Sequence, residues 1–431
     1  MSLRVTRLSR FVGCDIPPGV SASQHPAKRR VPLVAWLLLA IAGGALTGTL
    51  LGTRASVLGE LGVLVVKLLK ALATPLVFFA VVDSFCRQKV PAKKGALLLG
   101  ICALNATVAG AIAIGLSWAI APGNRTDVGA LRAALAPGET APTPRMLDPL
   151  TALKELVPES IPEPFSKNNV LTIVILAVIV GAALRGMRAR GQGERLVGLV
   201  EEAYQLLASV LHSIIALVPF AVFGVVAKVV GTSGFAIMGS LAALVGTVTA
   251  GLLLHVLLWY SLLVFFVAGR SPVTFFRAAG AALGTAFATG SSMATLPVTL
   301  RTLAKELRVS SGSARLAACV GTNFNNDGIM LYEVVAALFI AQINGIHLGV
   351  GDKVQLAITS AIAAAGIAGV PEAGLITLSL VLTSVGLPLS SLPVLLTVDW
   401  LLGRMRATTN VASDLVVATL LDRLGGRSAE D

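Results

Sequence analysis

Charge-free apolar runs recur along this chain of 431 residues, and several are long enough to cross a lipid bilayer as a helix. They cover residues 31–53, 95–124, 203–227 and 278–300, and the run 229–269 has the length of two crossings. Charged residues make up 13% of the chain, against about 25% in a soluble domain. The runs are continuously apolar rather than alternating, which argues against a β-barrel. The sequence therefore predicts an all-α polytopic membrane protein.

Positive charge, a formal excess of +12, gathers in short clusters between the apolar runs. The clusters are Arg4, Arg7, Arg10, Lys28, Arg29 and Arg30; Arg87, Lys89, Lys93 and Lys94; Arg185, Arg188, Arg190 and Arg195; Arg270 and Arg277; and Arg301, Lys305, Arg308 and Arg315. If the chain crosses at each run, these clusters share one face, which the positive-inside rule assigns to the cytoplasm. We expect a multi-pass protein of the inner (plasma) membrane with both termini cytoplasmic, and no nucleic-acid partner.

Cysteine and histidine give no sign of a metal site or a disulfide framework. They are Cys14, Cys86, Cys102 and Cys319, and His25, His212, His255 and His347. No pair of them has the spacing of metal ligands, so packing or interfacial roles are the expected ones. A glycine-lysine loop of the Walker type, which would indicate primary pumping, is also missing from the sequence. We expect neither a cofactor nor enzymatic activity.

The first part of the chain has the pattern of conventional spans. Residues 1–30 form a basic tail, and spans are expected near 31–52, 57–84, 95–121, 168–185, 200–229 and 234–269. A polar connection, 122–167, separates the third span from the fourth, and long loops of this kind are usually functional or linkers. These spans contain few polar residues that would be costly to bury, and Asn105 in the third span is the main exception.

Two apolar segments in the second part are interrupted by small and helix-breaking residues. Segment 278–300 contains GSSMATLP (290–297), and segment 354–387 contains GIAGVPEAG (366–374). Each is followed by a helix with polar residues that are costly to bury: Asn325 and Asp327 after the first, and Arg406, Asn410 and Asp414 after the second. One kinked segment would be ordinary, but the repetition of the whole unit favours a transporter with its site near the membrane midplane.

The last apolar segment carries five residues on one helical face. Asp399, Gly403, Arg406, Asn410 and Asp414 follow one another at spacings of 4, 3, 4 and 4. Arginine presents a fork of donors that suits a carboxylate, and an aspartate is a hard oxygen ligand for a small cation. The alternative is that the span ends near Asp399 and the remainder is an amphipathic cytoplasmic tail.

These motifs resemble the dicarboxylate/amino acid:cation symporter family, which includes the glutamate transporters and their prokaryotic homologues. The resemblance covers roughly 31–422 and is most specific in SSMATLP, NNDGIMLYEVVAALFIAQ, GVPEAG and RATTNVASD. It implies eight transmembrane helices, two re-entrant helical hairpins, inverted repeats and a homotrimer with an elevator mechanism.

The resemblance also divides the chain. Residues 31–269 would be a scaffold-rich half that includes a transport-domain helix, 95–121, and an extracellular loop, 122–167. Residues 270–422 would form the transport core, with both hairpins and the last two helices, and residues 423–431 a cytoplasmic tail.

By the same resemblance, site residues can be assigned. The substrate would contact Gly290, Ser291, Ser292, Ile329, Val370, Gly403, Arg406, Ala407 and Asn410. The transported sodium ion or proton would involve Gly321, Asn323, Asn325, Asp327, Asn410, Asp414 and Asn105, and Glu333 matches a glutamate that carries a proton in animal members. The alternative for the asparagines is that they cap the helix that begins near Gly328.

Several positions depart from the family pattern and bear on cation and substrate. Cys102, Asn105 and Ala106 stand where sodium-coupled members often carry Tyr, Thr and Ser or Thr, which puts the sodium stoichiometry in question. Gly403 replaces the aspartate that binds the amino group of amino-acid substrates, and Ala407 replaces a threonine. We therefore expect a C4-dicarboxylate as the preferred small carboxylate, with an acidic or neutral amino acid as the alternative. A channel or anion conductance is a more distant one.

Overall fold

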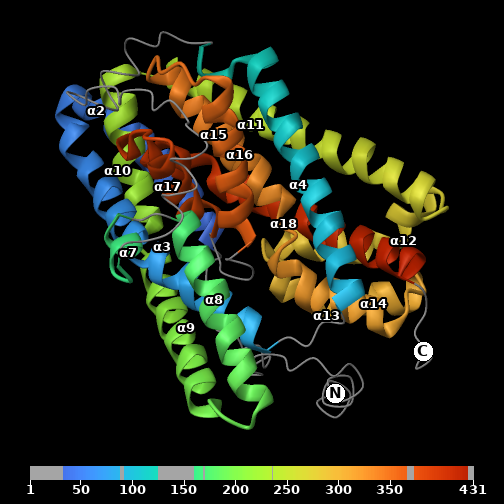
Figure 1. The fold of residues 1–431 in the computed structure, drawn as a ribbon. Coiled ribbons are helices and arrows are strands. Elements are labelled where there is room, and N and C mark those ends of the chain that lie inside the picture. The colour runs from blue at the N-terminus through green and yellow to red at the C-terminus, as the bar shows by residue number, and fades with distance from the viewer. Residues whose placement is uncertain are drawn as a thin grey trace, which may run out of the picture.

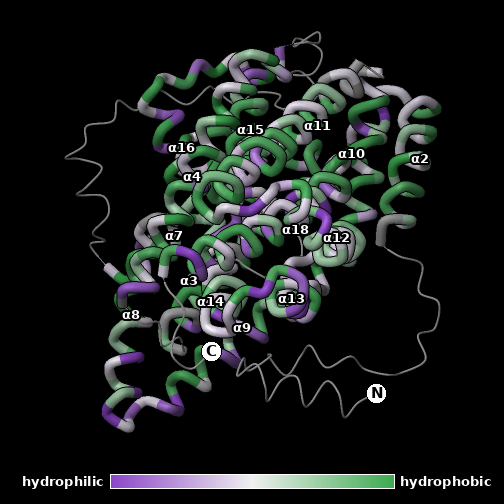
Figure 2. The backbone as a smooth tube through the Cα atoms, turned by 90° about the vertical axis from the view of Figure 1, so that its right-hand side faces the viewer, coloured by the Kyte–Doolittle hydropathy of each residue, from purple (hydrophilic) through white to green (hydrophobic). Residues whose placement is uncertain are grey.

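The structure is a computed structural model that describes residues 33–87, 92–124, 160–167, 170–234, 236–365 and 373–425. Every regular element in those ranges is helical (Figure 1). The helices form two packed groups, which are described in turn. Hydrophobic residues cover most of both groups, and the turn between α8 and α9 is hydrophilic (Figure 2). The prediction of an all-α protein is confirmed for the described part of the chain.

The first group lies on the left of Figure 1 and contains α2, α3, α8, α9 and α10. Its elements are α2 (Leu33–Leu51), the 3₁₀ helix η2 (Gly52–Gly59), α3 (Glu60–Arg87), α8 (Val170–Ala189), α9 (Glu194–Ile215) and α10 (Val218–Ser233). Helix α10 packs along α2 and η2, and α3 packs against α8 and α9. The short helix α7 (Glu163–Lys167) precedes α8.

Glycines allow α2 and α10 to approach closely. A Cβ atom added at Gly44 would lie 2.6 Å from the carbonyl oxygen of Phe223, and one added at Gly48 would lie 2.6 Å from that of Ala227. Helices in a membrane associate largely through such close packing of small residues, because lipid supplies no hydrophobic driving force between them.

The second group contains α4 and the elements from α11 onward. They are α4 (Ala92–Ile120), η3 (Pro122–Asn124), α11 (Ala236–Leu254), the π-helical segments η4 (His255–Tyr260) and η5 (Leu263–Val267), α12 (Pro272–Thr289), α13 (Ser292–Arg301), η6 (Thr302–Glu306), α14 (Ser311–Arg315), η7 (Leu316–Val320), η8 (Gly321–Asn323), α15 (Asp327–Ile343), α16 (Val350–Ala365), α17 (Ala373–Ser384), η9 (Leu389–Ser391) and α18 (Leu392–Leu424).

Helix α15 is the centre of the second group. Nearly all of its side chains are buried, and it packs against α4, α11, α16, α17 and α18. Helix α11 falls within residues 31–269, the predicted scaffold-rich half, yet it packs on α4, α15 and α18. The structure therefore joins α11 as well as α4 to the elements around α15.

Both interrupted segments are helical pairs that fold back on themselves. Helix α12 ends at Gly290 and α13 begins at Ser292, and Arg270 Nη1 donates to the carbonyl oxygen of Leu307, 2.5 Å away, at the open end of the pair. In the second pair, Gln355 near the start of α16 donates to the carbonyl oxygen of Ser384 at the end of α17, 3.3 Å away. The first predicted interruption is confirmed at Gly290, whereas Pro297 lies inside α13. The second interruption, 366–372, lies outside the described residues.

One sequence prediction about spans needs correction. The expected span 200–229 is two helices, α9 and α10, with a bend of 42° between them. Pro219 stands in the first turn of α10, where its missing N–H group costs no helical hydrogen bond but prevents α9 from continuing. The expected span 234–269 agrees with one long helical stretch, Leu241–Val267, that passes into π-helix.

By length and hydropathy, five helical stretches of the described residues are able to cross a membrane, or six if the bent pair α9–α10 counts as one span. The expected number of eight spans with two re-entrant hairpins stays a prediction.

Helix α18 continues well past Asp399. It runs unbroken from Leu392 to Leu424, and its side chains are buried as far as Leu421. The alternative of a cytoplasmic amphipathic tail is therefore wrong, and the five polar positions share one buried helix.

Candidate functional site

The chain leaves α-helical geometry immediately before α15. It passes through a π-helical turn (η7) and a 3₁₀ turn (η8), and α15 then begins at Asp327. Asn326 occupies the N-cap position without a side-chain capping hydrogen bond. Its amide instead donates to the carbonyl oxygens of Thr322, at 3.2 Å, and Ala364, at 2.8 Å. The capping alternative is therefore wrong for Asn326, which joins this irregular segment to α16.

The start of α15 lies directly against α18. The backbone N–H of Gly328 donates to Asn410 Oδ1 at 2.9 Å, and Asn410 Nδ2 donates to Asn326 Oδ1 at 3.0 Å. A Cβ atom at Gly328 would lie 2.7 Å from the carbonyl oxygen of Arg406, so only glycine permits this approach. Both ends of the Asn410 side chain, predicted to contact substrate and cation, are thus used within the protein.

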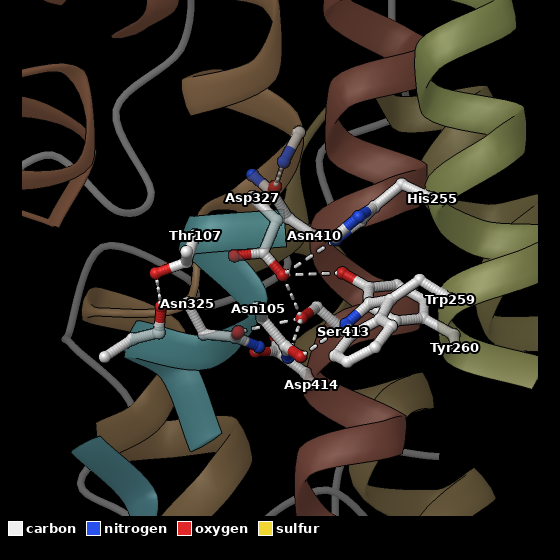
Figure 3. Close-up of polar contacts among 12 residues, drawn as sticks. Asn105, Thr107, His255, Trp259, Tyr260, Asn325, Asp327, Asn410, Ser413 and Asp414 are labelled. Carbon is white, nitrogen blue, oxygen red and sulfur yellow. Dashed lines mark hydrogen bonds and ion pairs between the residues drawn. The ribbon is translucent and has the colours of Figure 1, made fainter. Parts of the chain in front are cut away.

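Polar side chains of α15 and α18 meet below this contact (Figure 3). Asn325 Nδ2 donates to Asp414 Oδ1 at 3.2 Å, and the Ser413 hydroxyl lies 2.7 Å from Asn325 Oδ1 and 2.8 Å from Asp327 Oδ2. Asn325, Asp327 and Asp414 are all buried. The structure therefore brings together three of the predicted cation residues.

Helix α4 and the π-helical segment η4 complete this cluster. Tyr260 OH donates to Asp327 Oδ2 at 2.7 Å, and His255 Nε2 lies 3.4 Å from the same oxygen. Trp259 Nε1 donates to Asn105 Oδ1 at 2.9 Å (Figure 3). A packing or interfacial role was expected for His255, and Trp259 and Tyr260 were not among the predicted site residues. The available signal in the sequence is that three side chains able to donate a hydrogen bond stand within six residues of an apolar span.

Arg406 is the buried cation of the predicted substrate site, and it has partners within the protein. Its guanidinium group makes a two-pronged contact with Asp399, at 2.5 and 3.1 Å, and stands 4.1 Å from the centre of the Tyr332 ring. It reaches back two helical turns because Gly403 has no side chain, and a Cβ atom there would lie 3.3 Å from Arg406 Nη2. A Cβ atom added at Gly374 in α17 would lie 2.8 Å from Cζ of the same guanidinium group. The role of Asp399 was missed, although its place on this face was predicted.

The tip of the first helical pair is held by backbone-directed contacts. Gly290 ends α12 with a φ of 66°, a left-handed conformation that favours glycine. Ser291 caps α13 by accepting a hydrogen bond from the N–H of Ala294 at 3.2 Å. Arg404 of α18 donates to the carbonyl oxygens of Phe287 and Ala288, at 2.9 and 2.6 Å. The predicted substrate residues at this tip therefore lie beside α18.

The remaining predicted residues are distributed around these contacts. Ile329 and Ala407 are buried beside Gly328 and Arg406 in the chain, and Ser292 is the half-buried first residue of α13. Gly321 and Asn323 lie in η8, where Asn323 Nδ2 donates to the carbonyl oxygen of Val320 at 3.4 Å. Val370 lies outside the described residues.

Glu333 is buried in α15 with an exposure of 0%. Neither of its carboxyl oxygens makes a hydrogen bond of standard geometry within the described residues, and the groups that face it are the neutral hydroxyls of Ser360 in α16 and Thr377 in α17. An ionised carboxylate in such surroundings is costly, so the position is suited to a group that carries a proton.

Broken helical pairs around buried polar residues are typical of membrane transporters that couple substrate to ions. The chain matches the model of the Sodium:dicarboxylate symporter family over residues 33–424. It belongs to this family, whose members are transporters rather than enzymes and use no cofactor.

Individual relatives are animal proteins of the same family. The chain is 36% identical to human excitatory amino acid transporter 1 over 281 residues, which are 64% of this chain and 51% of that protein. It is 36% identical to rat excitatory amino acid transporter 4 over 301 residues, which are 68% of this chain and 53% of that protein. The aligned part thus spans about half the length of these relatives.

Proposed function

We propose that this protein is a secondary active symporter that carries an acidic amino acid together with sodium ions across a membrane. The observation on which the proposal depends is the buried pair of Arg406 and Asp399 on α18, beside the unwound start of α15. Arg406 offers two donors to a substrate carboxylate. The names of the relatives, excitatory amino acid transporters, support this choice of substrate.

Asp399 is a candidate partner for the amino group of the substrate. The absence of a side chain at Gly403 favours a C4-dicarboxylate, since an ammonium group would lack a partner there. However, the carboxylate of Asp399 lies one turn away on the same face and reaches the guanidinium group of Arg406 across Gly403. A substrate carboxylate on Arg406 would release Asp399 to pair with an ammonium group. With this exchange of partners, both Arg406 and Asp399 remain paired with an opposite charge when an amino acid is bound. The arrangement therefore supports an amino acid as the substrate.

A panel of uptake measurements in proteoliposomes tests the proposal. Aspartate, glutamate, serine, succinate and malate are each offered with an inward sodium gradient or an inward proton gradient. We expect aspartate or glutamate to be taken up and to be displaced poorly by succinate. Uptake of succinate that aspartate does not inhibit would instead identify a C4-dicarboxylate carrier, the candidate that Gly403 and Ala407 favour.

The same preparation separates a carrier from a channel or anion conductance. A carrier gives saturable uptake that stops when the cation gradient is removed, whereas flux through a pore rises without saturation and needs no cation partner. The proposal further includes a homotrimer with an elevator mechanism in the plasma membrane. Native mass spectrometry of the purified protein would detect the trimer directly.

A further inference from the structure

One oxygen of Asp327 is surrounded by hydrogen-bond donors of the protein itself. Tyr260 OH and Ser413 Oγ lie 2.7 and 2.8 Å from Asp327 Oδ2, and His255 Nε2 lies 3.4 Å from it (Figure 3). A carboxylate oxygen has about two lone-pair directions, and the two hydroxyl groups are placed to use both. The histidine adds a longer and weaker contact.

The tyrosine is the firmest of these donors. Ser413 has one hydroxyl proton and two close acceptors, Asn325 Oδ1 and Asp327 Oδ2, at 2.7 and 2.8 Å. The hydroxyl of Tyr260 also lies near that of Ser413, but the carboxylate oxygen Asp327 Oδ2, 2.7 Å away, is the stronger acceptor for the phenolic proton. All of these groups are buried, so water does not compete for the carboxylate.

The side chain of Asn105 also has hydrogen-bond partners within the protein. Its Oδ1 atom, the only oxygen that it could offer to a cation, accepts the indole N–H of Trp259 at 2.9 Å. Its Nδ2 atom faces Ser413 Oγ at 3.5 Å. The neighbouring positions Cys102 and Ala106 on α4 bring no oxygen ligand.

A cation site presents oxygen lone pairs towards an empty centre, whereas here N–H and O–H groups point their positive ends at those oxygens. A sodium ion at Asp327 Oδ2 would have to displace Tyr260 and Ser413 and would leave buried donors unsatisfied. The side chains around Asn105 and Asp327 therefore do not fit a cation at this place.

We propose that Tyr260, Ser413 and the Trp259–Asn105 pair take the place of one transported cation, so that Asp327 is a hydrogen-bond centre and not a sodium ligand. The inference rests on the proposed function, because it concerns how many sodium ions accompany each substrate. The network joins α4, η4, α15 and α18 without an ion, so this part of the site is assembled before sodium arrives. Sodium would then bind only on the Asp414 side.

Equilibrium binding of radioactive sodium ions to the purified full-length chain tests the inference, because bound ions can be counted whether or not the protein transports. We expect Asp327→Asn to bind as many sodium ions per chain as the unmodified protein. Loss of one bound ion in Asp327→Asn would overturn the inference. Asp414→Asn is the comparison, and we expect it to lose a bound ion. Retention of every ion in that variant would count against sodium binding at Asp414, but the result for Asp327→Asn could still be interpreted.

Tyr260→Phe keeps the test decisive if Asp327→Asn does not fold. The phenyl ring fills the same space and removes only the hydroxyl donor, which opens one lone pair of Asp327 Oδ2. We expect the affinity for sodium to rise in this variant. An unchanged or lower affinity would contradict the inference, and a lower one is the result that a tyrosine hydroxyl acting as a sodium ligand would give.

Discussion

Two buried ionisable residues of the site have opposite surroundings at the scale of single residues. Arg406 has a carboxylate partner in Asp399 and an aromatic face in Tyr332. Glu333, the next residue after Tyr332 in α15, makes no hydrogen bond of standard geometry within the described residues, and neutral hydroxyl groups of Ser360 and Thr377 face it instead of a charged partner. A paired charge can stay ionised through a transport cycle, whereas an unpaired carboxyl is stable only while it holds a proton. Glu333 is therefore the residue at which proton coupling is expected.

Substitution of Glu333 by glutamine imitates the protonated carboxyl permanently. We expect Glu333→Gln to transport substrate at a rate that no longer varies with pH, because no proton has to bind or leave. The measurement is sodium-driven uptake in proteoliposomes over a series of pH values. Glu306→Gln is the matched control, since Glu306 is an exposed carboxyl on η6, and its pH profile should equal that of the unmodified protein. A normal pH profile in Glu333→Gln would refute proton transfer by this residue.

At the scale of elements, close contact between α2 and α10 depends on glycine. The carbonyl oxygen of Ala227 occupies the place that a Cβ atom at Gly48 would take. Such contact does not arise everywhere, because Gly100 in α4 has open space around its own Cβ position. Gly48 therefore allows close packing of two helices, whereas Gly100 has no such role, although both lie within apolar helices.

The two glycines offer a paired test of this packing. Gly48→Ala should destabilise the protein by about 1–3 kcal/mol, because the backbone of α10 must move away. Gly100→Ala should be neutral or stabilising by up to about 1 kcal/mol, because alanine is the better helix former. Thermal unfolding of the purified variants in one detergent measures both. Equal unfolding midpoints for the two variants would show that the α2–α10 contact is looser than the structure has it.

At the scale of the whole molecule, the distribution of charge predicts an orientation in the membrane. The hydrophilic turn between α8 and α9 carries one of the basic clusters, with Arg188, Arg190 and Arg195 exposed (Figure 2). From the positive-inside rule we expect this turn in the cytoplasm. Helix α8 joins it to the region of Ser160 across one span, so Ser160 should lie on the opposite side.

Single cysteines at these two exposed positions test the orientation in a chain whose own four cysteines have been replaced. We expect Gln192→Cys to react with a membrane-impermeant maleimide only from the cytoplasmic side, in inside-out vesicles. Ser160→Cys should react in intact cells. The reverse pattern would invert the topology, and labelling of both positions from one side would mean that α8 does not cross.

Much of this architecture follows from the sequence alone, because it depends on local chemistry. Charge-free runs specify helices in a membrane, and Gly290 marks where the first helical pair turns. The spacing of Asp399, Gly403, Arg406, Asn410 and Asp414 predicts a single helical face, which α18 confirms. The prediction was wrong at 200–229, because a continuously apolar run does not reveal that the helix breaks beside Pro219.

Only the tertiary structure decided which polar groups pair with one another. Asp399 reaches Arg406 because Gly403 leaves room between them, and Tyr260 reaches Asp327 because η4 packs against α18 and α4, which also pack against α15. These partners are 7 and 67 residues apart in the chain. Periodicity assigns a residue to a face of its own helix, but the partner across that face depends on how separate helices cross. In a buried membrane site, each polar group must be satisfied by another part of the protein or by the transported substrate or cation. The crossing of the helices therefore determines which polar groups remain available to bind substrate and cation.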